Sequence, residues 1–446
     1  MDQATVYVVG AGPAGLFAAR KIATAGHQVF IINRDIKPGG LAEYGIYPQK
    51  FHMKNGLRKQ FAKILALPNI HYIGNARIRS DERLTIEGLR DWQPTAIVFA
   101  VGAQGTKKLG LAGEDSKGVY SAKDFVYHYN LLPPFASQDF STGRRVAIVG
   151  MGNVMVDIAR WLMIDQPGEK PDEVTVIARR GPFEVKFDRK EFDEVEAFLD
   201  RELFQEELSR VAEACKAVGQ DVSQVADTTF PWLKAQPDAA PKSKLAFRFL
   251  ASPVGIEPGE NGRIAQLRVV ENLLVRDGDN TKAKATDKQT SLDIDTLIFA
   301  IGDLADPGVG LPYSRNSYVT NSDPAEPDRA AYEVFDPASG KVLEGIFVVG
   351  WARKASEGLV GKARFDAEHG VDHVLKYLER AERKPTPSGE EILRELRGKG
   401  LEVVTKEDVA RLIQVEAAQA QSLGLPEFKF STNQEMLRAI EAKVAG

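Results

Sequence analysis

The sequence predicts an α/β chain in which one βαβ unit is inserted into another and a helical extension follows. Two segments, residues 5–24 and 144–163, each read as a buried strand, a glycine-rich turn and an amphipathic helix. Three further apolar strands end in glycine, within residues 95–103, 295–303 and 345–352. At 446 residues the chain is too long for one ordinary core, so at least two domains are expected.

The first unit carries a complete glycine fingerprint, Gly10-x-Gly12-x-x-Gly15, between a strand and a helix. The first glycine permits a tight turn, the second lets the backbone approach a pyrophosphate, and the third lets the helix pack on the strand. The positive end of the helix then faces the phosphates. The pattern alone is weak, but in this context it predicts a Rossmann-like dinucleotide-binding domain rather than a fortuitous turn.

The second unit has a less regular fingerprint, because Met155 stands where glycine or alanine normally allows close packing after Gly150 and Gly152. Its second strand ends in Arg179 and Arg180. Arginines there suit a ribose 2′-phosphate, whereas sites for NAD usually carry a carboxylate. A solvated basic turn is the alternative, and NADP(H) is favoured over NAD(H).

Two dinucleotide sites in one chain suggest one flavin and one nicotinamide nucleotide. Because the flavin ring accepts hydride, we expect no catalytic side chain and no metal. The single cysteine, Cys215, excludes an intrachain disulfide, a Cys-x-x-Cys redox pair and a cysteine-ligated cluster. It lies in a helical stretch, where a packing role is expected.

Composition narrows the class of protein further. The formal net charge of −4 argues against general affinity for nucleic acid. No apolar run approaches the length of a membrane span, and a strand begins at Thr5 in place of a secretory signal. We therefore expect a cytoplasmic protein, or one inside an organelle after removal of a presequence.

Motifs along the whole chain resemble the adrenodoxin-reductase type of ferredoxin–NADP reductase, with a looser similarity to the glutamate synthase small subunit. The resemblance rests on these stretches: GAGPAGLFAARKI, GGLAEYGIYP (39–48), LAGEDSKGVYSAKDFVYHYN (111–130), GMGNVMVDIARWL, ARRGPFEVKFDRKE (178–191), FRFLASP (247–253), GWARKASEGLVGKARFDAEHG (350–370) and GKGLEVVTKEDVARL (398–412). It implies FAD and NADP(H) as cofactors and a ferredoxin or similar iron–sulfur protein as partner.

The resemblance also implies which residues contact the cofactors. The implied flavin contacts are Ala14, Asn33, Leu41, Ile78, Trp351, Gly358, Leu359 and Val360. The implied NADP contacts are Met151, Gly152, Asn153, Val154, Arg179, Arg180, Glu191 and also Gly358. The quoted motifs add Gly10, Gly12, Pro13, Gly15, Gly40 and Gly350 as candidate cofactor-binding residues.

The chain departs from the family pattern at several of these places. Asn33 replaces a glutamate that would hold the adenosine ribose, and we expect its amide to make a weaker contact, directly or through water, unless Asp35 takes its place. Lys50 stands near the position of a family histidine, which puts an inherited proton-transfer role in doubt. His52 is not a safe substitute.

We expect the NADP domain to be inserted into a discontinuous FAD domain. The predicted limits are 1–105 and 306–380 for the FAD domain, 106–305 for the NADP domain and 381–446 for the C-terminal extension. Residues 190–250 read as helical and 262–295 as antiparallel strands. Ser388 with Glu391 and Thr432 with Glu435 form capping boxes in the helical extension.

Two other functions remain open. The chain could be a flavin-binding subunit that docks in a larger complex of the glutamate synthase kind through its Ala- and Gln-rich tail helix, or an NADPH sensor without electron transfer. For a reductase, an acidic ferredoxin would meet a basic face. The candidates for that face are Arg144, Arg145, Lys186, Arg189 and Lys190, although nearby acidic residues make a solvated surface equally consistent.

Overall fold

The computed structural model describes residues 3–234, 242–323, 325, 331–354 and 360–442, and their contacts divide the chain into two units. The first unit spans residues 1–107, 127–137 and 302–446, and the second spans 108–126 and 138–301. The second unit is thus inserted in the first, as the sequence predicts. The 127–137 stretch, which the predicted limits left inside the insertion, groups with the first unit.

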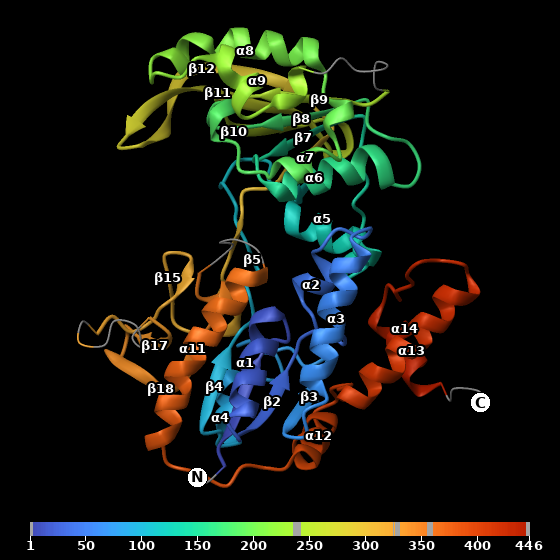
Figure 1. Cartoon of the computed structure of the whole chain (residues 1–446), viewed down its shortest axis with the longest axis vertical. Coiled ribbons are helices and arrows are strands. Elements are labelled where there is room, and N and C mark those ends of the chain that lie inside the picture. The colour runs from blue at the N-terminus through green and yellow to red at the C-terminus, as the bar shows by residue number, and fades with distance from the viewer. Residues whose placement is uncertain (1–2, 235–241, 324, 326–330, 355–359, 443–446) are drawn as a thin grey trace. The chain divides into compact units, whose positions relative to one another are not determined.

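A six-stranded sheet forms the centre of the first unit, in the order β17-β18-β4-β1-β2-β3 (Figure 1). Its neighbours pair in parallel except β17, which is antiparallel to β18. The strands are β1 Thr5–Val9, β2 Gln28–Ile32, β3 Ile70–Ile73, β4 Ala96–Phe99, β17 Glu333–Asp336 and β18 Lys341–Val348; the short pairs are β5 Gly105–Thr106 with β14 Asp303–Leu304, and β15 Tyr313–Ser314 with β16 Ser317–Tyr318.

Helices cover both faces of this sheet because successive strand residues point to opposite sides. Val6 and Val8 of β1 join one apolar cluster, with α1, α3 and α11, whereas Tyr7 and Val9 join another, with α4 and α12 (Figure 1). Burial on both faces explains the nearly continuous apolar runs of the strands. The helices are α1 Pro13–Thr24, α2 Leu41–Tyr44, α3 Phe51–Leu65, α4 Ile86–Asp91, α11 Val360–Arg380, α12 Gly389–Gly398, α13 Lys406–Ser422 and α14 Asn433–Glu441.

The C-terminal extension is helical, as predicted, and belongs to the core of the first unit. Leu396 of α12 is fully buried in one cluster, and Leu412 of α13 and Met436 of α14 are buried in the other. Both predicted capping boxes are present, and Thr405 with Asp408 forms a third. Each helix therefore buries apolar side chains within the unit, although Ile413 on α13 is 50% exposed.

The second unit contains a five-stranded sheet in the order β6-β13-β7-β8-β9, with every pair parallel. Its strands are β6 Val119–Ser121, β7 Arg145–Val149, β8 Glu173–Ile177, β9 Lys244–Arg248 and β13 Thr296–Phe299. Its helices are α6 Asn153–Arg160, α7 Arg189–Phe192, α8 Arg201–Lys216 and α9 Val225–Thr228, while α5 Ala122–Tyr129 begins in this unit and ends in the first.

Strands β10 Ala251–Pro258, β11 Ile264–Asp277 and β12 Asn280–Asp293 form an antiparallel sheet in the second unit, which confirms the prediction for 262–295. The prediction that 190–250 is helical was wrong at its end, where β9 is an edge strand of the parallel sheet. Only the three residues Leu245, Ala246 and Phe247 of β9 are apolar and buried, a run too short to distinguish strand from helix. Within the described ranges, no helix combines the length and the hydrophobicity needed to cross a bilayer.

Cys215 lies on α8 and is fully buried, so the expected packing role is confirmed. Burial, with the negative charge of Glu184 nearby, raises the pKa of its thiol to about 11. A raised pKa means that the folded protein keeps the thiol protonated where a free cysteine has already ionised.

We expect Cys215 of the folded protein to react slowly with Ellman's reagent at pH 9, where about one thiol in a hundred is ionised at such a pKa. Reaction should become rapid and stoichiometric in guanidinium chloride. Free glutathione under the same conditions is the control, and fast labelling of the native protein would contradict this assignment.

Candidate functional site

The turn after β1 brings three backbone segments of the first unit together. A Cβ atom on Gly10, whose φ is +102°, would lie 2.6 Å from the carbonyl oxygen of Ala100. A Cβ on Gly15 would lie 1.9 Å from the carbonyl oxygen of Gly10, so only glycine lets the helix pack on the turn. Around Gly12, by contrast, none of the described residues has an atom within 4 Å of a built Cβ, which leaves space for a ligand.

Helix α1 begins here without a side-chain cap. Gly12 is the N-cap in an extended conformation, and Pro13, the first helical residue, has no N–H to satisfy. The N–H groups of the first turn therefore face the space beside Gly12, with the positive end of a 12-residue helix behind them. This is the geometry of an anion cradle of the kind that binds phosphates.

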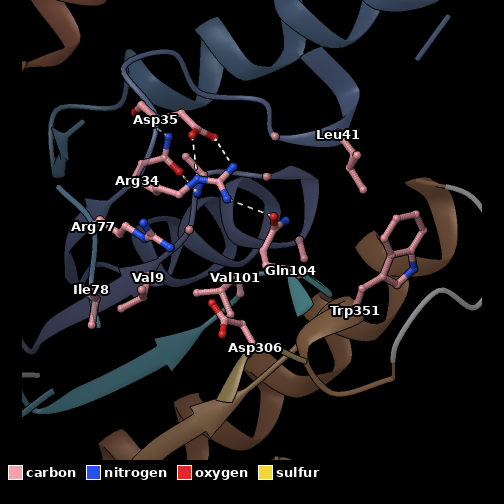
Figure 2. Close-up of a pocket in the computed structure, with 18 of the residues that line it drawn as sticks. Val9, Arg34, Asp35, Leu41, Arg77, Ile78, Val101, Gln104, Asp306 and Trp351 are labelled. Atoms are coloured by element: carbon pink, nitrogen blue, oxygen red, sulfur yellow. Dashed lines mark hydrogen bonds and ion pairs between the residues drawn. The ribbon is translucent and has the colours of Figure 1, made fainter. Parts of the chain in front are cut away.

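A pocket in the first unit extends from this turn. Figure 2 shows Leu41 and Trp351 at one end of the pocket and Arg77 and Ile78 at the other. The predicted site residues that line it are Gly10, Gly12, Pro13, Ala14, Asn33, Gly40, Leu41, Ile78 and Trp351. The sequence did not indicate Tyr44, Arg77, Arg79, Gln104, Tyr127 or Asp306, which also line it.

Gly350 adjoins the pocket without lining it. A Cβ atom built on Gly350 would lie 2.5 Å from the Cβ of Ala14, so a side chain there would clash. It opens the short 3₁₀ helix η9 Gly350–Ala352, which carries Trp351. Asp366 of α11 accepts a hydrogen bond from the Gly350 N–H at 2.6 Å and pairs with Arg353, so both ends of η9 are fixed. Gly358 and Leu359 lie outside the described residues, and the side chain of Val360, where α11 begins, does too.

The side-chain amide of Asn33 makes its hydrogen bonds within the protein. Its Oδ1 accepts from the N–H of Ala11 at 2.9 Å, and its Nδ2 donates to the Asp35 carbonyl at 2.9 Å and to the Tyr72 hydroxyl at 3.0 Å. Both amide hydrogens are thus directed into the protein. The side chain ties the end of β2 to the glycine turn, because backbone groups at a buried strand end need partners.

Arg34 and Asp35 form a charged pair in the wall of the pocket (Figure 2). The guanidinium is bidentate on the Asp35 carboxylate, at 2.8 and 3.1 Å, and donates to Gln104 at 3.0 Å. Burial opposes the charge of Arg34, but Asp35 outweighs it and raises the pKa of the guanidinium. The opposite charges of Arg34 and Asp35 therefore largely cancel in the wall of the pocket.

The second unit repeats the turn at Gly150, where a Cβ would lie 2.2 Å from the carbonyl oxygen of Ala300. Gly152 caps α6 without a side-chain bond, and within the described part of the chain no atom lies within 4 Å of its built Cβ. Met155 is fully buried, so the larger side chain is accommodated within the core. Asn153 exchanges hydrogen bonds with Asp188, at 2.7 and 2.8 Å, and so fixes the start of α6.

The remaining predicted NADP contacts lie on the same unit. Arg179 is exposed and Arg180 half-buried directly after β8, on a backbone held by Asn272, which donates to the Arg179 carbonyl at 2.9 Å. Met151 is half-buried in the turn and Val154 is 47% exposed on α6. Glu191 is half-buried on α7.

Other candidates from the sequence lie elsewhere. Lys50 caps α3 and His52 is exposed on it, and neither is among the described residues that line the pocket. Of the candidate docking residues, Arg144 pairs with Asp172 at 2.7 Å and Arg145 with Asp293 at 3.8 Å. Lys186, Arg189 and Lys190 are exposed.

Known proteins of similar sequence span almost the whole chain. An NADPH-ferredoxin reductase, FprA, of Mycobacterium tuberculosis is 27% identical, in an alignment that covers 97% of this chain and 98% of that protein. A mitochondrial NADPH:adrenodoxin oxidoreductase of Salvelinus fontinalis is 27% identical, with coverage of 98% and 91%.

The structure agrees with these relatives. Mycobacterium tuberculosis FprA in complex with NADPH superimposes with a TM-score of 0.81 at 25% identity, covering 99% of this chain and 100% of that one. The fold class and the resemblance predicted from the motifs are therefore confirmed. The family model for pyridine nucleotide-disulphide oxidoreductase matches residues 4–311, and the chain belongs to the pyridine nucleotide-disulphide oxidoreductase family.

Proposed function

We propose that the chain is an FAD-dependent reductase that passes electrons between NADPH and a ferredoxin-like iron–sulfur protein. The observation that carries the proposal is a pair of uncapped glycine turns, one in each unit. Only the second is followed by two adjacent arginines, of which Arg179 is exposed and Arg180 half-buried. Relatives named for NADPH-ferredoxin and NADPH:adrenodoxin reduction, aligned from end to end, support it.

The residues of the first unit fit FAD. The open space at Gly12 and the free helix start suit its pyrophosphate, and the apolar surface of Leu41 and Trp351 suits a flat ring system. Asp35, at the end of β2, is the acidic group available to the adenosine ribose once Asn33 is committed to the turn. When bound, the flavin would accept a hydride and release electrons singly.

The second unit suits NADP(H). Gly152 and the start of α6 would hold the pyrophosphate, and Arg179 and Arg180 would hold the 2′-phosphate. The candidate contacts Met151, Asn153, Val154 and Glu191 belong to the same proposal.

The single cysteine separates this chain from disulfide reduction, the chemistry in the family's name. Reduction of a disulfide through a redox-active cysteine pair needs two thiols, and the chain has only Cys215, which is buried in α8. A one-electron carrier of the ferredoxin type is therefore the better acceptor. The alternative of a complex subunit loses support, because the relatives aligned from end to end are named as ferredoxin and adrenodoxin reductases.

The purified protein should be yellow, and its flavin absorbance should bleach under anaerobic NADPH titration. With a ferredoxin added, NADPH should support reduction of cytochrome c. Bleaching by neither NADPH nor NADH would contradict the proposed function.

Replacing both arginines, Arg179→Ala with Arg180→Ala, should raise the KM for NADPH about tenfold or more, because charge-assisted bonds to the 2′-phosphate are lost. The KM for NADH should change little, since NADH lacks that phosphate. The exposed Arg145→Ala in the same unit is the matched control, and an equal rise for both nucleotides would remove the 2′-phosphate assignment.

The docking face is tested by Lys186→Glu with Arg189→Glu. We expect a higher KM for ferredoxin at low ionic strength and a smaller difference at high salt, because salt screens surface charges. Flavin reduction by NADPH is measured in parallel as a control. An unchanged KM for ferredoxin at low salt would exclude this face.

A further inference from the structure

One wall of the proposed flavin pocket is the short segment 37–44, which lies across the glycine turn. Gly39 donates to the carbonyl of Ala11 at 2.8 Å, and a Cβ on Gly40 would lie 3.1 Å from the Cα of Gly12. Gly40, Leu41 and Tyr44 then line the pocket. Helix α2 in this wall has only four residues and cannot be stable by itself, so other contacts must hold it.

Those contacts converge on Glu43, which is 3% exposed. Arg58 of α3 makes two bonds to its carboxylate, at 2.6 and 2.7 Å. Lys429 lies 3.1 Å from the same carboxylate and donates to the Glu43 carbonyl at 2.9 Å. Lys37, at the start of the wall, lies 3.4 Å from Glu43 and is also buried.

The C-terminal extension supplies the other half of this network. Glu416 of α13 accepts from Lys37 at 2.6 Å, and both side chains are less than a tenth exposed. Lys429, between α13 and α14, also lies over the ring of Tyr44 at 5.0 Å. Glu427 pairs with Arg58 and, at 3.0 Å, with the buried Lys54.

Each charge in this cluster depends on its neighbours. Burial opposes ionisation of Glu43, but Lys37 and Lys429 outweigh it and hold the pKa of that carboxyl well below its usual range. Burial likewise opposes the charge of Lys37, but Glu43 and Glu416 raise its pKa above the ordinary value. Removing one partner would leave a buried charge uncompensated, which is costly.

We propose that Glu416 and Lys429 of the C-terminal extension are positioning residues for the flavin site: through Lys37 and Glu43 they hold the pocket wall against the glycine turn. This inference rests on the proposed function, since it names what keeps the FAD site in shape. Neither Glu416 nor Lys429 is among the described residues that line the pocket. Their effect on the cofactor must therefore pass through the wall.

The test is a double-mutant cycle in the full-length chain. Flavin is removed, and the dissociation constant for FAD is measured by fluorescence titration for the wild type, Lys37→Met, Glu416→Met and the double variant. We expect Glu416→Met to weaken FAD binding about tenfold or more. The buried Lys37 cation would lose its nearest carboxylate and would displace the wall as it moves toward another partner or water. The double variant should bind better than Glu416→Met, because the Lys37 cation that has lost its nearer partner is removed as well. Lys429→Met should weaken binding in the same direction.

Leu396→Ala is the matched control, since Leu396 is fully buried in α12 and packs in the cluster on the other face of the sheet. It should lower the melting temperature of the apoprotein and leave the FAD dissociation constant near the wild-type value. The visible circular dichroism of bound flavin should change in Glu416→Met and not in Leu396→Ala.

Wild-type FAD affinity in Glu416→Met would overturn the inference while leaving the proposed function intact. An equal loss of affinity in Leu396→Ala, at an equal loss of melting temperature, would also overturn it. If the wild-type chain bound no FAD, the proposed function would fail and this inference with it.

Discussion

Both units are organised around a backbone contact that leaves no room for a side chain. In each, a glycine directly after the first strand lies against an alanine directly after the neighbouring strand: Gly10 against Ala100, and Gly150 against Ala300. The amide of that alanine donates back to the first strand at 2.8 Å in both cases. The position of the helix and the open N–H groups at its start depend on this contact, because the positive φ of Gly10 and of Gly150 turns the chain sharply there.

The two units place arginine at the end of the second strand in opposite electrostatic settings. In the first, Arg34 is neutralised by Asp35 and sequestered by Gln104, so little positive charge is left for a phosphate. In the second, Arg179 is exposed and Arg180 half-buried. The backbone that carries them is held by the side-chain amide of Asn272, which donates to the Arg179 carbonyl. The same residue type thus belongs to a nearly neutral pocket wall in one unit and is accessible to an anion in the other.

Local sequence was sufficient for much of the fold. The strand, turn and helix around Gly10 and around Gly150, the hairpin at 264–293 and the capping boxes all depend on neighbours within a few residues. Strand β9 was missed because its apolar run is short, and tertiary pairing alone decides its conformation. The hydrogen bond from Asn33 to the Tyr72 hydroxyl could not be predicted locally, because the two residues are 39 positions apart.

The buried charges of the pocket wall could not be predicted from the sequence either, because their partners are far away along the chain. Lys37, Glu43 and Lys429 are buried, although lysine and glutamate are seldom buried in proteins. Lys37 and Glu416 are 379 positions apart. This separation has a consequence for biosynthesis: at about 5–20 residues per second, roughly 20–75 s pass between the synthesis of Lys37 and that of its counter-ion Glu416. Throughout that interval the pocket wall lacks the residues that hold it in place. We therefore expect the cofactor to bind late, after translation is complete.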